Sequence, residues 1–242
     1  VQNVHGIKLD QVDNVSNINV PALDAERLKQ KDQPMNQEEL SGFRGMVGTL
    51  NWTVGNTRPD LTFDMISLST RFKGGNIEDL IAAKKALVNL QRNAAYITIS
   101  NVQPVQQCEI WCFSDAAFRN LNEGIDSAGG YVILVVNTHS GLCAPIDWKA
   151  NKIKRKVAST LAAETLSLGT ALDAAVGVRD MIAEVTNDKV ILQIKAIVDN
   201  KSCRDAVYST TSVTERRLRA EIALIKEYEE EKIITEVKWI RG

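Results

Sequence analysis

The hydrophobic residues of this chain change their spacing near residue 96, and that change narrows the folds the chain can adopt. Between residues 36 and 92 they recur every three or four positions, which is typical of amphipathic helices. After residue 96, short runs such as "CEIWCFSD" and "GYVILVVN" are rich in β-branched and aromatic residues and are separated by turn residues. The chain therefore joins a helical segment to a segment that contains a sheet.

Three helices are predicted in the helical segment. Asn36 is suited to cap the first of them, with Glu39 in the position that completes a capping box. The second restarts after Pro59, a residue that fits the first turn of a helix. The third is predicted from Ile77 to Gln91, after the helix-breaking "GGN".

The order of elements after residue 96 predicts an α/β fold. Three strands come first, with "NEGIDSAGG" as a hairpin loop, and a long helix follows from about Ser159 to Val185. The strand "VILQIKAIVDN", two helices and the closing strand "TEVKWIRG" complete the chain. This order is typical of a mixed sheet flanked by helices.

The composition excludes several classes of protein. The chain is 44% hydrophobic and 24% charged with a net charge of −1, which argues against a disordered chain or a globally basic nucleic-acid binder. The two isolated histidines, His5 and His139, make a Ser-His-Asp triad or a histidine-ligated zinc site a poor fit. The spacing of Cys108, Cys112, Cys143 and Cys203 matches no zinc pattern, so buried reduced thiols are expected. Any catalysis is therefore expected to depend on carboxylates.

Three carboxylates occupy positions where α/β proteins build sites. Asp115 and Asp199 are each predicted at the carboxyl end of a strand, and Glu164 shares the apolar face of the long helix. An inward carboxylate is costly unless it is paired, protonated or bound to a cation. Three hard oxygen donors suit Mg²⁺ or Mn²⁺, and two such ions about 4 Å apart can hydrolyse a phosphodiester. The alternative, that each acid is a cap, a turn residue or part of a solvated face, stays open at this point.

Several stretches taken together resemble a known family. They are "FRGMVGTLNWTVGNTRPDLTFDM", "SDAAFRNL", "GGYVILV", "IDWKANKIKRKVASTLAAETLSL", "VDNKS" and "TERRLRAEIALIKE". They resemble the C-terminal part of copia-type LTR retrotransposon Pol, which comprises the end of the reverse transcriptase, a helical connection and a ribonuclease H domain. The resemblance covers about residues 40–242, and "GIKLDQ" is similar to the last hairpin of the polymerase palm.

The resemblance implies a domain order and a fold. Residues 1–39 would be the end of the palm and a linker, residues 40–95 the helical connection, and residues 96–242 a ribonuclease H-like domain with a mixed five-stranded sheet. The activity implied is cleavage of RNA in an RNA–DNA hybrid with Mg²⁺ or Mn²⁺. The partners implied are the hybrid and the rest of the Pol polyprotein or a larger assembly. No run of about 18 apolar residues and no signal peptide is present, so an intracellular location without a membrane is expected.

The resemblance also assigns roles to individual residues. The first, second and third acids of the family correspond to Asp115, Glu164 and Asp199, which would be the catalytic metal ligands. Beside them, a basic stretch becomes a candidate phosphate track, although a solvated turn is the alternative from sequence alone. The residues expected to contact nucleic acid are Lys149, Lys152, Lys154, Arg155, Lys156, Ser159, Thr160 and Asn200.

The chain departs from the family in one respect. The family's fourth acid lies on a helix after the last strand, whereas this sequence ends at "KWIRG". Glu221 is not expected to replace it, because its helix has a structural pattern, and the palm's Tyr-x-Asp-Asp motif is absent. We therefore expect a fragment that cleaves hybrid weakly and does not polymerise DNA. Two alternatives remain: a truncated or domesticated relic with a structural or nucleic-acid-binding role, and a related integrase-type or exonuclease-type enzyme.

Overall fold

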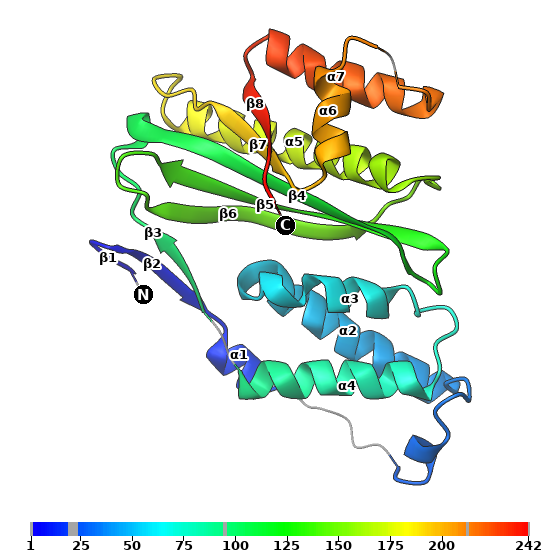
Figure 1. Ribbon diagram of the computed structural model, residues 1–242. Coiled ribbons are helices and arrows are strands. Elements are labelled where there is room, and N and C mark those ends of the chain that lie inside the picture. The colour runs from blue at the N-terminus through cyan, green and yellow to red at the C-terminus, as the bar shows by residue number, and fades with distance from the viewer. Residues whose placement is uncertain (1, 19–23, 94–95, 212, 242) are drawn as a thin grey trace. The chain divides into compact units, whose positions relative to one another are not determined.

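The computed structural model of the chain is drawn in Figure 1 and describes residues 2–18, 24–93, 96–211 and 213–241. Its backbone divides into two compact units. One is formed mainly by Lys8–Ile97, and the other by Gln2–Ile7 together with Thr98–Gly242. The domain boundaries expected after residues 39 and 95 remain predictions, and residues 94 and 95 lie outside the described part of the chain.

The first unit is helical, as the hydrophobic spacing predicted. A short helix α1 (Val12–Ser16) precedes α2 (Gln37–Thr57), α3 (Thr62–Ser69) and α4 (Ile77–Arg92). The capping box of Asn36 and Glu39 is confirmed, and Asn76 forms a second one at the start of α4. The core shared by these helices includes Phe43, Leu50, Ile77, Leu87 and Leu90, all fully buried.

A small sheet is separate from the five-stranded sheet, and the sequence pattern did not predict it. It consists of β1 (Gln2–Asn3), β2 (Gly6–Asp10) and β3 (Tyr96–Ser100), in the order β1-β2-β3. The predicted strand "YITIS" is β3, so it is a strand but does not belong to the five-stranded sheet. A sequence pattern predicts that a segment forms a strand, but it does not predict which strand pairs with it, because pairing depends on segments distant in the chain.

The second unit contains the mixed five-stranded sheet, and the predicted fold class is confirmed. Its strands are β4 (Cys108–Leu121), β5 (Asp126–Asn137), β6 (Cys143–Lys152), β7 (Ile194–Val198) and β8 (Ile234–Trp239). The order is β6-β5-β4-β7-β8. Strands β4, β5 and β6 pair antiparallel, whereas β7 pairs parallel with both β4 and β8. The parallel pairs require crossover connections, which are supplied by helices.

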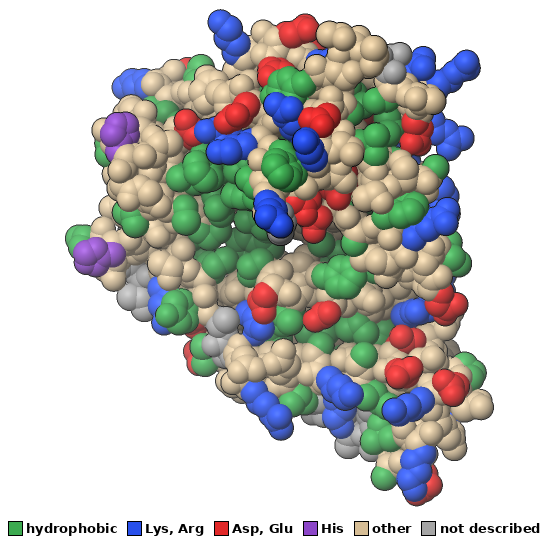
Figure 2. All heavy atoms as spheres, viewed as in Figure 1, with side chains coloured by type: hydrophobic (Ala, Val, Ile, Leu, Met, Phe, Trp, Pro, Cys, Tyr) green, Lys and Arg blue, Asp and Glu red, His purple; other side chains and the backbone are tan. Residues whose placement is uncertain are grey.

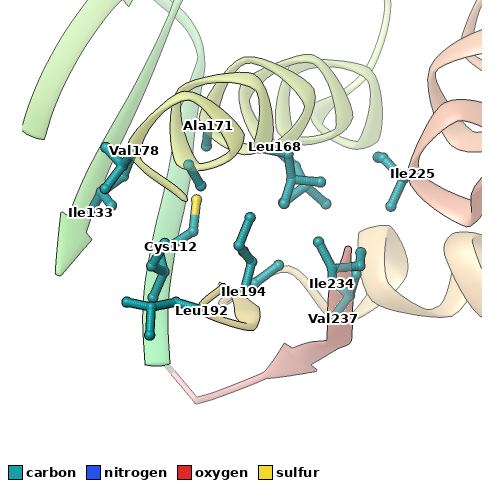
Figure 3. Close-up of a cluster of buried hydrophobic side chains, with 14 of the residues drawn as sticks. Cys112, Ile133, Leu168, Ala171, Val178, Leu192, Ile194, Ile225, Ile234 and Val237 are labelled. Atoms are coloured by element: carbon teal, nitrogen blue, oxygen red, sulfur yellow. The ribbon is translucent and has the colours of Figure 1, made fainter. Parts of the chain in front are cut away.

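Helix α5 (Thr160–Val185) provides most of the cover for this sheet, together with α6 (Lys201–Tyr208) and α7 (Arg219–Glu230). In Figure 3, Leu168, Ala171 and Val178 of α5 point toward side chains of the sheet, among them Cys112 and Ile194. By length and composition alone α5 could cross a membrane, but 56% of its apolar window is buried, as in the core helix of a folded domain.

The hairpin between β4 and β5 is tighter than predicted. The loop was expected to cover "NEGIDSAGG", but β5 already begins at Asp126, and only residues 122–125 lie between the two strands. Ala128 is a reason for the difference, since it pairs with Ala117 on β4 and with Lys152 on β6. Two-sided pairing outweighs the low strand propensity of Gly and Ser residues.

The cysteines are free, as expected, but not all of them are buried. Cys108, Cys112 and Cys203 are buried, whereas Cys143 is exposed. The expectation of four buried thiols was therefore wrong for Cys143, which begins the edge strand β6. The end of an edge strand has a neighbour on one side only, so its first side chain remains accessible to water.

Candidate metal centre

Asp115 lies in the middle of a strand and not at its end. The prediction of a strand-end position was wrong because β4 continues to Leu121, paired with β5 on one side. On its other side, the parallel pairing with β7 stops at Ser114, opposite Val198. Asp115 is thus the first residue of β4 beyond its parallel partner, and its side chain is exposed there.

Asp199 follows directly on β7, as predicted. The next residue, Asn200, caps α6, since its side-chain oxygen accepts a hydrogen bond from the Cys203 amide at 2.9 Å. The backbone carbonyl of Asp199 accepts a hydrogen bond from the indole nitrogen of Trp239 at 2.9 Å. These contacts fix the backbone around Asp199 while its carboxylate remains exposed.

Glu164 lies in the second turn of α5 and is buried, with only 4% of its surface exposed. Ser159 caps the helix five residues earlier, where its hydroxyl accepts a hydrogen bond from the Ala162 amide. The neighbours Ala162 and Ala163 are also buried.

The three acids converge on one place. Asp115 of β4, Glu164 of α5 and Asp199 after β7 each offer a carboxylate oxygen, and these oxygens all lie within 4.8 Å of one another. Oxygens at such separations can ligate a common cation or bridge a pair of cations about 4 Å apart. The structure therefore places side by side three residues that are 49 and 35 positions apart in the chain.

Burial sets the electrostatics of this cluster. It raises the pKa of Glu164 from 4.5 to about 8, and the negative charges of Asp115 and Asp199 act in the same direction. Hydrogen bonds from the Ala116 amide and the Asn200 side chain oppose the shift only in part. A positive charge placed among these groups would favour the ionised form of all three carboxylates.

The donor set fits a hard divalent cation. The Oε2 atom of Glu164 is buried and has no hydrogen-bond partner within the described residues. An orphaned oxygen on a buried carboxylate is costly unless a proton or a metal ion balances it. Oxygen ligands without histidine or cysteine suit Mg²⁺ or Mn²⁺ better than zinc.

The predicted basic track divides into paired and exposed cations. Lys152 and Lys156 each lie 2.6 Å from a carboxylate oxygen of Asp126, and Arg155 lies 2.7 Å from Glu221. Lys149 and Lys154 are exposed, and no ion pair joins them to another residue in the described ranges. Moreover, Lys149 and Lys152 belong to strand β6, so the stretch is only partly the turn that was considered as an alternative. In Figure 2, basic and acidic side chains are interspersed over the visible face.

Two of the three polar residues predicted to contact nucleic acid, Ser159 and Asn200, have structural partners. Besides capping α5, the Ser159 hydroxyl lies 3.3 Å from a carboxylate oxygen of Glu215. Thr160 is the exposed first residue of α5. Asn200 has the most direct link to the acids, because its side chain hydrogen-bonds Glu164 and also caps α6.

Two buried residues, Asp126 and Ser167, were not predicted from the sequence to belong to the surroundings of the metal centre. Asp126 is buried, and its contacts with Lys152 and Lys156 hold the pKa of its carboxyl well below the usual range. Ser167 is buried one turn after Glu164, and its hydroxyl lies 2.8 Å from the Asp115 carbonyl oxygen. Ser167 could have been predicted from its spacing, because a residue three positions after Glu164 lies on the same side of the helix. The partners of Asp126 become visible only when the pairing of β5 with β6 is known.

Comparisons with known proteins give weak likenesses. No protein-family model and no curated protein matches the chain. Among solved structures, LC11-RNase H1, isolated from compost by a metagenomic approach, has 15% identity and a TM-score of 0.39, and the match covers 55% of this chain and 84% of that one. The same enzyme in complex with an RNA/DNA hybrid gives 13% identity, a TM-score of 0.36, and coverage of 55% and 85%. RNase H1 from the archaeon Halobacterium salinarum has 14% identity and a TM-score of 0.34, and the match covers 55% of this chain and 86% of that one.

Proposed function

We propose that the second unit of this chain is a ribonuclease H module, which hydrolyses RNA in RNA–DNA hybrids with divalent metal ions held by Asp115, Glu164 and Asp199. The observation that carries the proposal is the convergence of these three carboxylates, with candidate oxygens within 4.8 Å of one another. The sequence motifs around the same three residues, "SDAAFRNL", "STLAAETLSL" and "VDNKS", support the same activity by their resemblance to copia-type Pol.

The roles of the residues follow from their exposure. Divalent ions at such a site activate water and stabilise the oxygen that leaves the phosphodiester. Asp115 and Asp199 are exposed, so their carboxylates can hold cations where a nucleic-acid backbone can also reach them. Glu164 is buried and would hold its side of the site, while the hydrogen bond from Asn200 orients its carboxylate.

The wider context is part of the proposal. The motif resemblance extends to the helical segment, and it supports an origin in the Pol polyprotein of a copia-type retrotransposon. In that context the chain acts inside the cell, with the remainder of the polyprotein as partner. Selection of the hybrid would depend on groove shape and the 2′-hydroxyl groups of the RNA strand and not on base sequence.

A cleavage assay on matched substrates tests the function. The RNA strand of a labelled hybrid is expected to be cut with Mg²⁺ or Mn²⁺, and the same RNA is expected to stay intact when single-stranded, paired with RNA, or treated with EDTA. Cleavage of single-stranded RNA at the same rate would contradict the proposal. Metal-dependent binding of hybrid without cleavage under any of these conditions would favour a non-catalytic subunit.

The basic residues are expected to contribute unequally to hybrid binding. Lys149 and Lys154 have no acidic partner among the described residues, whereas Lys152 and Lys156 share the buried Asp126. Replacing Lys149 and Lys154 with Gln should lower the slope of log K against log salt by up to about 1.8, or about 0.9 per lost phosphate contact.

Lys152 and Lys156 provide the matched comparison. Their double replacement with Gln should lower the slope less, because part of their charge already compensates Asp126. Affinity measured at several salt concentrations, with Ca²⁺ in place of Mg²⁺ to prevent cleavage, gives both slopes. If neither double variant changes the slope, this stretch is a solvated surface and not a phosphate track.

A further inference from the structure

We propose that Ser167 is a positioning residue of the metal centre: its hydroxyl, which lies against the bare backbone of Gly129, sets the separation between Glu164 and Asp115. The inference rests on the proposed metal-binding function and adds to it the contact that holds two ligands in place. Ser167 itself lies on the side of α5 that faces the sheet, and it is 4% exposed.

The hydroxyl of Ser167 joins α5 to two strands of the sheet by hydrogen bonding. Its Oγ lies 2.8 Å from the backbone carbonyl oxygen of Asp115 and 3.2 Å from that of Gly130. Asp115 and Gly130 are partners in the β4–β5 ladder, so one hydroxyl reaches both strands at the level of the first metal ligand. The shorter distance identifies the Asp115 carbonyl as the main acceptor of its single proton.

Ser167 also packs tightly against Gly129 of β5. A Cβ atom placed on Gly129 would lie 2.9 Å from Ser167 Oγ and 3.1 Å from Ser167 Cβ. The helix reaches its present distance from the sheet only because Gly129 has no side chain. Gly130 differs, since a Cβ there would meet Lys149 and Ala150 of β6 and not the helix. The hydroxyl of Ser167 and the missing side chain of Gly129 are therefore complementary.

Helix α5 links the contact at Ser167 to the metal ligand Glu164. Ser167 follows Glu164 by three residues, which is about 4.5 Å along a rigid helix on the same side. A shift of α5 at Ser167 is therefore passed on to the Glu164 carboxylate. Metal–oxygen distances tolerate only about 0.2 Å, and changes in groups that orient ligands commonly reduce metal affinity by about 10- to 100-fold.

Metal titration of the full chain, without nucleic acid, tests the proposal. The probe is Mn²⁺, with affinity measured by calorimetry and folding checked by circular dichroism. Ser167→Ala is expected to weaken binding by about tenfold, and Gly129→Ala by at least as much, because the added methyl group displaces the helix. Combining the two changes should recover part of the affinity lost in Gly129→Ala, since the nearest atom, Oγ, is then gone.

Thr170→Ala is the matched control on the same helix. Thr170 is exposed, and among the described residues its hydroxyl bonds only to the Leu166 carbonyl of α5 itself, so Mn²⁺ affinity should not change. Folded Ser167→Ala with wild-type affinity would overturn the positioning role and leave the metal site standing. Absence of Mn²⁺ binding in the unchanged chain would instead remove the proposed function and this inference with it. If Gly129→Ala fails to fold, the Mn²⁺ affinity of Ser167→Ala alone decides whether Ser167 positions the metal ligands.

Discussion

Replacing Asp199 with Asn is expected to lower metal-dependent cleavage of RNA–DNA hybrid by at least about a hundredfold relative to the unchanged chain, without loss of the fold. The substitution keeps the size of the side chain and removes one of three carboxylates whose candidate ligand oxygens lie within 4.8 Å of one another. Asp199 is exposed, so its carboxylate contributes little to packing. The cations it would help to hold share the work of orienting water and stabilising the developing charge.

Two measurements separate a metal effect from damage to the fold. The rise in melting temperature on adding Mg²⁺ should be reduced in Asp199→Asn, and the melting temperature in EDTA should not fall. Asp205→Asn is the matched control, since Asp205 is an exposed acid six residues later whose carboxylate pairs with Arg204. It should cleave like the unchanged chain, and equal losses in the two variants would show that the effect is not specific to the metal centre.

Glu164→Gln is expected to stabilise the metal-free protein at pH 8 while it removes the response to metal. In the folded protein the pKa of Glu164 is raised from 4.5 to about 8, with burial as the largest cause. Folding therefore opposes ionisation of the Glu164 carboxyl, whereas the same carboxyl ionises freely in the unfolded chain. A neutral amide avoids this conflict, and its NH₂ group can donate to the neighbouring carboxylates of Asp115 and Asp199.

The sign of the pH dependence follows from linkage. A carboxyl whose folded pKa lies above its unfolded value costs nothing below about pH 4.5, and its cost grows as pH rises toward 8. At pH 8 we expect the variant to gain about 1–3 kcal/mol, a rise of roughly 2–10 °C in melting temperature, with little gain at pH 4.5. Both measurements are made in EDTA.

Glu184→Gln on the same helix serves as the control for Glu164→Gln. Glu184 is exposed, so its replacement should leave the melting temperature nearly unchanged at both pH values. The unchanged chain should also become more stable at pH 8 when Mg²⁺ or Mn²⁺ is added, because bound metal favours the ionised carboxylates. A Glu164→Gln variant that melts lower than the unchanged chain at pH 8 would show that the ionised carboxylate is satisfied without metal.

Features that depend on neighbouring residues in the chain were determined by the sequence itself. The capping box at Asn36, the helix after Ser159 and the helical character of residues 37–57 agree with the structure. Each is decided by contacts within about four positions, where spacing and side-chain type are enough. The fold class followed as well, because the order of strands and helices restricts the ways a mixed sheet can be assembled.

Features that depend on strand pairing were decided only by the tertiary structure. Asp115 lies in mid-strand and not at a strand end because β4 continues beside β5 after β7 has stopped. Lys152 and Lys156 meet Asp126 only once β6 has paired with β5, so their partner could not be read from the basic stretch. The contact of Ser167 with Gly129 and with the Asp115 carbonyl likewise joins a helix to two strands. These contacts link residues 26 to 52 positions apart, and local sequence cannot specify them because register is set by long-range packing.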